Sequence, residues 1–125
     1  MMDPEHARFR RNYPRFPGVP ETIRLLKLRG TGGAYLDAIL WEFRDHASSV
    51  LDEAMDAVRE EDDERVRYLL VGELAETGDH RLLDFFVELL DDLHESVAHW
   101  AQVGLEHIDT KDARRALYEH RFPRH

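Results

Sequence analysis

The chain has 125 residues, no cysteine and a formal net charge of −9. This length predicts one domain that buries about two thirds of its unfolded surface, and the lack of cysteine excludes disulfides, thiol chemistry and cysteine-based zinc sites. The sequence contains neither a run of about 18 apolar residues that would predict a membrane span nor a secretory-signal pattern, so we expect a cytoplasmic protein.

The N-terminal segment is basic, whereas the remainder of the chain is acidic. Residues 1–30 carry seven Arg or Lys against three acids, and residues 31–125 carry ten against twenty-three. From Arg8 to Phe16 cationic side chains alternate with aromatic rings. Three prolines argue against a regular helix here: Pro14, Pro17 and Pro20. Such an arm could bind nucleic acid or a membrane, but we favour an extended arm that lies over the first helices.

A short amphipathic segment follows the arm. Its apolar residues are Ile23, Leu25, Leu26 and Leu28, and Gly30 closes it. We predict a short cap helix there. The expected organisation is an arm and cap helix over residues 1–33 and a helical repeat domain over residues 34–125.

The stretch from Asp62 to Asp92 contains the clearest helical pattern. Four apolar residues recur at spacings of three and four, which places them on one face of a helix: Val66, Leu69, Leu70 and Leu74. Gly78 favours the left-handed conformation that ends a helix, and Asp79 can cap a new one. A second helix should start near His80. Its apolar set is too wide for a surface helix and predicts burial against more than one neighbour: Leu82, Leu83, Phe85, Phe86, Val87, Leu89 and Leu90.

This helical hairpin recurs with a period of about 31 residues. Adding 31 to the stripe of the first helix leads to Val97, Ala101 and Leu105, and subtracting 31 leads to Tyr35, Ile39 and Phe43. We therefore predict three hairpins, at 34–46 with 49–60, 64–77 with 80–92, and 95–108 with 110–120. The last helix is the least apolar, as expected of a terminal repeat that forms a polar cap.

The middle hairpin resembles the short HEAT repeats also found in phycobilin lyase-like proteins. The matching residues are Asp63, Val66, Arg67, Leu70, Leu74, Gly78 and Asp79. The third copy departs from the pattern at His94, Ala98 and Asp109, and the first copy lacks the Val-Arg pair. The resemblance implies an all-α fold, an α-solenoid of about three hairpins. Such solenoids serve mainly as binding surfaces, so the resemblance does not identify a function.

No residue pattern requires an enzyme, a metal or a cofactor. His94 and His99 are five residues apart, which does not place two imidazoles on one helical face. The serines fall at predicted helix starts, where capping explains them: Ser48, Ser49 and Ser96. Carboxylate pairs four residues apart, such as Asp84 with Glu88, would share a proton only if buried. We therefore assign no catalytic residue and no metal ligand.

Carboxylates on the second helices are the best functional signal. By resemblance, these helices line the concave surface of a HEAT-like stack, where an acidic strip would form from Asp52, Asp56, Asp84, Glu88 and Asp91. Trp41 lies off the apolar stripe, either as an anchor for a partner or beneath the N-terminal arm, which we favour slightly.

The leading hypothesis is a non-enzymatic protein that binds a basic protein through this strip. A specific form of it is an immunity or antitoxin protein that blocks a cationic toxin. An alternative is a lyase-like or chromophore-handling role, for which Trp41, Trp100, His99 and Asp79 are the candidates. Binding of nucleic acid through the arm is a further alternative, and the acidic repeats argue against it. A fourth reading is a scaffold that self-associates, and the oligomeric state stays open.

Overall fold

The computed structural model describes residues 15–28 and 33–123, and within these ranges it contains helices and no strands. The predicted all-α class is therefore confirmed. The chain divides into two compact units, Met1–Glu60 and Glu61–His125. The predicted stacking of three hairpins into one solenoid spans both units and stays a prediction, as does the predicted division at residue 33.

The first unit contains α2 (Val19–Lys27), α3 (Gly33–His46), the short 3-10 helix η1 (Ala47–Ser49) and α4 (Leu51–Glu60). Helix α2 packs against both α3 and α4. The fully buried side chains include Leu26, Phe43, Ala54 and Val58. The short helix predicted before the first hairpin is thus present, as α2, while its role as a cap stays a prediction.

Helix α2 begins earlier than the sequence pattern indicated. Pro20 was expected to argue against a helix, but it lies in the first turn of α2. A proline is tolerated there because the amides of the first turn have no acceptor within the helix. The buried Thr22 hydroxyl donates to the Gly18 carbonyl at 2.7 Å. On the exposed side, a hydrogen bond from Arg24 holds the pKa of Glu21 below its ordinary value.

Most of the predicted N-terminal arm lies outside the described residues. Within the part that is described, Phe16 stacks on the imidazole of His46 with ring centroids 5.0 Å apart. His46 ends α3, and its Nδ1 lies 2.9 Å from the Glu42 carbonyl oxygen. The segment that precedes α2 therefore touches the end of α3.

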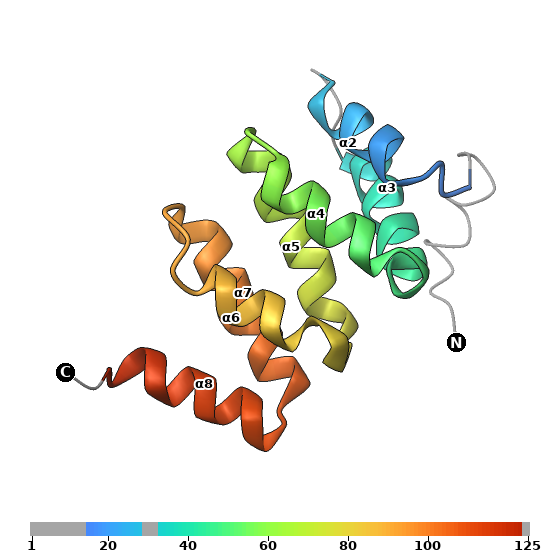
Figure 1. Ribbon diagram of the computed structural model, residues 1–125. Helices are drawn as coiled ribbons and strands as arrows, with labels where there is room; N and C mark the ends of the chain where they lie inside the picture. The colour runs from blue at the N-terminus through green and yellow to red at the C-terminus, as the bar shows by residue number, and fades with distance from the viewer. Residues whose placement is uncertain (1–14, 29–32, 124–125) are drawn as a thin grey trace. The chain divides into compact units, whose positions relative to one another are not determined.

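The second unit contains α5 (Glu64–Thr77), the 3-10 helix η2 (His80–Leu82), α6 (Leu83–Leu89), α7 (Glu95–Ile108) and α8 (Lys111–Arg121). Helix α7 is its centre, because α5, α6 and α8 all pack against it (Figure 1). The buried side chains of α5 and α7 include most of the predicted stripes: Val66, Leu70, Leu74, Val97, Ala101 and Leu105. Leu69, which was expected on the same stripe, is only half-buried, whereas Val71 and Ala75 are buried.

Helix boundaries follow the predicted period. Helices α3, α5 and α7 begin at residues 33, 64 and 95 and have 14 residues each. Gly78 ends α5 in the left-handed conformation with φ 64°, and Asp109 takes the equivalent place after α7 with φ 50°. The Asp79 side chain accepts from the Arg81 amide, as a cap should, but one 3-10 turn precedes α6. Consequently, α6 is shorter than the predicted helix, which ran from 80 to 92.

Close approach of α6 to α7 depends on Gly104. A Cβ atom placed on Gly104 would lie 2.5 Å from the Phe86 ring, a distance that real Cβ contacts do not reach. The Phe86 ring therefore occupies the space that a side chain at position 104 would need. Gly72 of α5 faces Trp100 of α7, but there the nearest ring atom would be 3.4 Å away, which is ordinary contact.

A bidentate ion pair ties the start of α5 to the turn between α6 and α7. Arg67 donates to both Asp92 carboxylate oxygens, at 3.1 and 2.8 Å, and each side chain is only 12% exposed. Asp92 also accepts from the His94 amide at 3.0 Å. Burial alone would raise the pKa of Asp92, but the bonds from Arg67 and His94 outweigh it and hold that pKa below its ordinary value.

We predict different effects for alanine at Gly104 of α7 and at Gly72 of α5. Gly104→Ala should lower the free energy of unfolding by about 1 to 2 kcal/mol, because overpacking against Phe86 outweighs the gain in helix propensity. The matched control, Gly72→Ala, should leave stability unchanged or raise it by up to about 1 kcal/mol. Urea unfolding followed by Trp100 fluorescence in a Trp41→Phe background measures both. Equal effects of the two variants would contradict the tight contact.

Ionised Asp92 should contribute to the free energy of unfolding at pH values above its ordinary pKa, and this contribution should be lost at pH values well below that pKa. Because the pKa is lowered in the folded state, the contribution is complete above the unfolded value of about 3.9 and is lost as the pH falls through the folded value. Asp92→Asn should cost about 2 kcal/mol at neutral pH, the level of a hydrogen bond to a charged group. That deficit should narrow below about pH 4. The exposed control Asp84→Asn should cost less than about 0.5 kcal/mol, and a deficit for Asp92→Asn that is independent of pH would refute this account.

Candidate functional site

Helix α6 has one buried side and one acidic exposed side. Phe85, Phe86 and Leu89 are buried, whereas Asp84, Val87 and Glu88 are exposed. Val87 was expected in the buried set, but it is 38% exposed because the short helix turns only one side toward α7. An apolar side chain is thus exposed beside two carboxylates. We call Asp84, Val87 and Glu88 the acidic face of α6.

The turn that follows α6 carries further acidic and apolar side chains. Asp91 is exposed, and its Oδ1 lies 3.7 Å from Nδ1 of His120 on α8. The next residue is Asp92, whose pair with Arg67 fixes the turn. Leu93 then projects from the same turn with its side chain 97% exposed. Acidic and apolar groups therefore continue beyond the last residue of α6.

The residues of the predicted acidic strip belong to both units. Asp52 and Asp56 lie on α4 of the first unit, both exposed, and Asp56 pairs with Arg59 at 3.1 Å. Asp84, Glu88 and Asp91 belong to the second unit. All of these carboxylates are exposed, so the burial that a shared proton would require is not found. A continuous strip across both units stays a prediction.

Asp79 and Trp100 have structural roles, whereas Trp41 as an anchor for a partner stays a prediction. Trp41 lies on α3 and is half-buried, with buried Leu40 and Glu42 beside it in sequence. Asp79 caps η2 and pairs with Arg81 at 2.8 Å. Trp100 packs on Gly72, which explains its position on α7.

The lyase-like alternative required an acid and aromatic groups in one groove. His99 meets the edge of the adjacent Trp100 ring, with centroids 5.6 Å apart. Asp79, the candidate acid, is engaged in the η2 cap and in its ion pair with Arg81. The geometry therefore gives this alternative no positive support.

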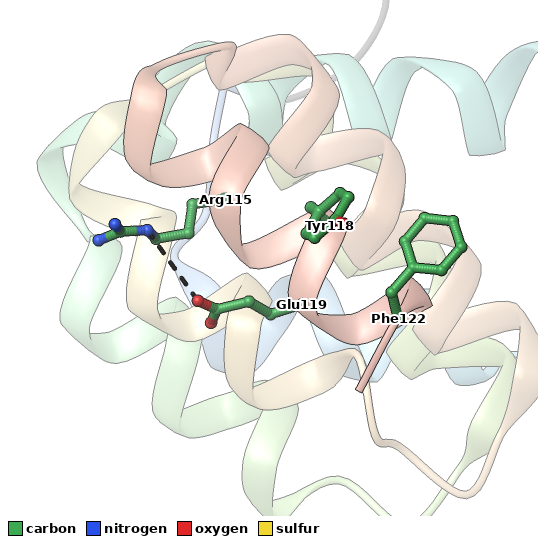
Figure 2. A pocket seen from close by; sticks show the side chains of 4 residues that line it. All are labelled: Arg115, Tyr118, Glu119 and Phe122. Atoms are coloured by element: carbon green, nitrogen blue, oxygen red, sulfur yellow. Dashed lines mark ion pairs between the residues drawn. The ribbon is translucent and has the colours of Figure 1, made fainter. Parts of the chain in front are cut away.

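Helix α8 presents a surface that the sequence reasoning missed. The helix was expected to form a polar cap, but Tyr118 is 64% and Phe122 56% exposed. Their rings lie 5.0 Å apart, and together with Arg115 and Glu119 they line a surface pocket, as Figure 2 shows. The spacing of four residues between Tyr118 and Phe122 was the available signal, since it places two rings on one helical face.

Charge separates α8 from the rest of its unit. Residues 61–110 contain fourteen acidic residues and three arginines, whereas residues 111–125 contain five Lys or Arg and two acids. On α8, Arg115 lies 4.0 Å from Glu119, and both side chains are well exposed. The second unit is thus an acidic body that ends in a basic, partly aromatic helix.

The described residues contain neither a metal-binding cluster nor a membrane-spanning helix. Among the residues that it describes, no three His, Asp or Glu side chains are grouped so that they could hold a metal ion. Within the same ranges, no helix has the length and apolar character needed to cross a membrane.

Comparison of the chain with protein-family models, with curated proteins and with solved structures finds no match. Membership of the HEAT family therefore stays a proposal that rests on the residues quoted above. The candidate site must likewise be argued from its own chemistry.

The exposed rings of α8 should contribute little to folding. We expect the double variant Tyr118→Ala/Phe122→Ala to change the free energy of unfolding by less than about 1 kcal/mol, because exposed substitutions and pairs four apart on a helix have small effects. In contrast, Phe86→Ala removes a fully buried ring and should cost about 3 to 5 kcal/mol. Thermal unfolding monitored by circular dichroism compares them. A large loss from the α8 variant would show that its rings belong to the core.

Proposed function

We propose that this chain is a non-enzymatic protein-binding module that engages a basic protein through the acidic face of α6. The observation that supports this proposal is that Asp84, Val87 and Glu88 are all exposed on a helix whose other side is packed on α7. Carboxylates beside an exposed apolar side chain match a basic patch that contains an apolar residue. The rigid backing means that little order would be lost on binding.

The charge of the surrounding unit supports the same partner. Residues 61–110 carry fourteen acids against three arginines, so the field around α6 attracts cationic surfaces and repels nucleic acid. Such a field accelerates encounter more than it strengthens the final complex. Affinity would therefore depend on the contact with α6 itself, while the charge of the rest of the unit would raise the association rate.

A specific form of this proposal is an antidote to a cationic toxin, for example a nuclease. A surface that offers carboxylates where such an enzyme would bind phosphate blocks it without any catalytic group. The resemblance of the middle hairpin to HEAT repeats supports a binding role, because such stacks display successive helices as one surface. By the same proposal, Asp52 and Asp56 would extend the surface, and the protein would act in the cytoplasm.

Charge reversal on α6 tests the proposal. The purified chain is immobilised, lysate from its source is passed over it, and basic proteins that are released by salt are identified and titrated by calorimetry. We expect Asp84→Lys/Glu88→Lys to weaken binding of such a protein by about 10- to 100-fold, in line with the loss of two contacting charges.

A second double variant controls for overall charge. Glu76→Lys/Glu106→Lys changes two exposed acids of α5 and α7 in the same unit and alters the net charge equally. It should slow association and change the affinity much less. Equal losses for the two double variants, or none for the α6 variant, would overturn the assignment to α6.

A further inference from the structure

Helix α8 carries a stripe of cationic and aromatic side chains that faces away from α7. Lys111, Arg115 and Tyr118 follow one another at spacings of four and three, which places them on one side of the helix. Phe122 directly follows the last residue of α8, and its ring lies 5.0 Å from that of Tyr118. The opposite side contains buried Ala113 and half-buried Ala116 and Leu117. We call these four outward residues the α8 stripe. Its two rings are the largest exposed aromatic side chains in the described part of the chain.

The acidic face of α6 has the complementary composition. Asp84 and Glu88 provide negative charge where Lys111 and Arg115 provide positive charge, and Val87 and the nearby Leu93 are exposed apolar groups like Tyr118 and Phe122. Both helices have their buried sides against α7. The turn after α6 also reaches α8, where His120 lies 3.7 Å from Asp91. One copy of the chain therefore displays both halves of a complementary pair on adjacent helices.

We propose that the occupant of the α8 stripe is the acidic face of α6 in a second copy of this chain. One two-fold axis places α8 of each copy on α6 of the other, so both contacts form together and the assembly closes as a dimer. Tyr118 and Phe122 pack on Val87 and Leu93 of the second copy, and Lys111 and Arg115 face Asp84 and Glu88. Aromatic side chains with arginine beside them are typical centres of such contacts.

The dimer would regulate access to the α6 face, and this regulatory role rests on the proposed function. The same α6 face would bind the basic partner, so self-association covers the binding surface until the partner displaces α8. In this arrangement α8 acts as an internal substitute for the basic partner. The dimer itself is measured in pure protein, without any partner, and its test is therefore separate.

Sedimentation equilibrium of the full chain, from low micromolar to submillimolar concentration, tests the dimer. The wild type should approach twice its monomer mass of 14.7 kDa. Lys111→Glu/Arg115→Glu and Asp84→Lys/Glu88→Lys should each weaken self-association at least about tenfold. An equimolar mixture of these two variants should dimerise again, because each mixed pair restores opposite charges at both contacts.

Two further variants make the result specific. Arg65→Glu/Arg121→Glu reverses two exposed cations that lie off the α8 stripe and should dimerise like the wild type. Tyr118→Ala/Phe122→Ala should be monomeric, with the circular dichroism spectrum of the wild type. A wild type that stays monomeric, a mixture that does not recover, or masses beyond two copies would each overturn the two-fold dimer.

Capture of the basic partner separates this inference from the proposed function. The monomeric variant Tyr118→Ala/Phe122→Ala keeps the α6 face and should bind the partner at least as tightly as the wild type does. A dimer that forms as described beside a chain that captures no basic protein would overturn the proposed function alone. Partner binding by a protein that never dimerises would overturn the dimer alone.

Discussion

The arrangement of the second unit depends on the ion pair between Arg67 and Asp92. The pair joins residues 25 positions apart in sequence, and both side chains are largely buried. Removing one partner would leave the other charge in a poorly solvated place, which makes such a pair costly to break. Asp92 also holds the His94 amide next to the start of α7. Through this one carboxylate, the first turn of α5 fixes where α6 ends and where α7 begins.

Orientation of α6 follows from that constraint and from the contact at Gly104. With the turn fixed, Phe86 enters the space beside Gly104, and the side of α6 that carries Asp84 and Glu88 is left exposed. A wider α6 interface would have buried Val87 as well. The acidic face is therefore exposed because only the side of α6 that carries Phe85, Phe86 and Leu89 packs on α7. The same packing leaves α8 as an outer helix, whose small residues Ala113 and Ala116 face inward.

Several features were predictable because they depend on local chemistry. The helix stop at Gly78 and the cap by Asp79 follow from backbone preferences of single residues, and the stripes at Val66, Leu70 and Leu74 follow from helical periodicity. The sequence reasoning failed where a competing local geometry or a tertiary contact decided the outcome. It excluded Pro20 from a helix that in fact begins one residue before it, and it placed Val87 in the core. It also expected α8 to be polar, although Tyr118 and Phe122 lie on its surface.

By itself, the sequence determined an all-helical chain, a period of about 31 residues between first helices, and an acidic body with a basic last helix. These properties depend on the order of residue types along the chain, which periodicity and charge counting can detect. Only the tertiary structure decided which carboxylates are exposed, that Asp92 is bound to Arg67 rather than available to a partner, and that two rings of α8 face outward. Such outcomes depend on which side of each helix is used for packing, and that choice is made by neighbours far away in sequence.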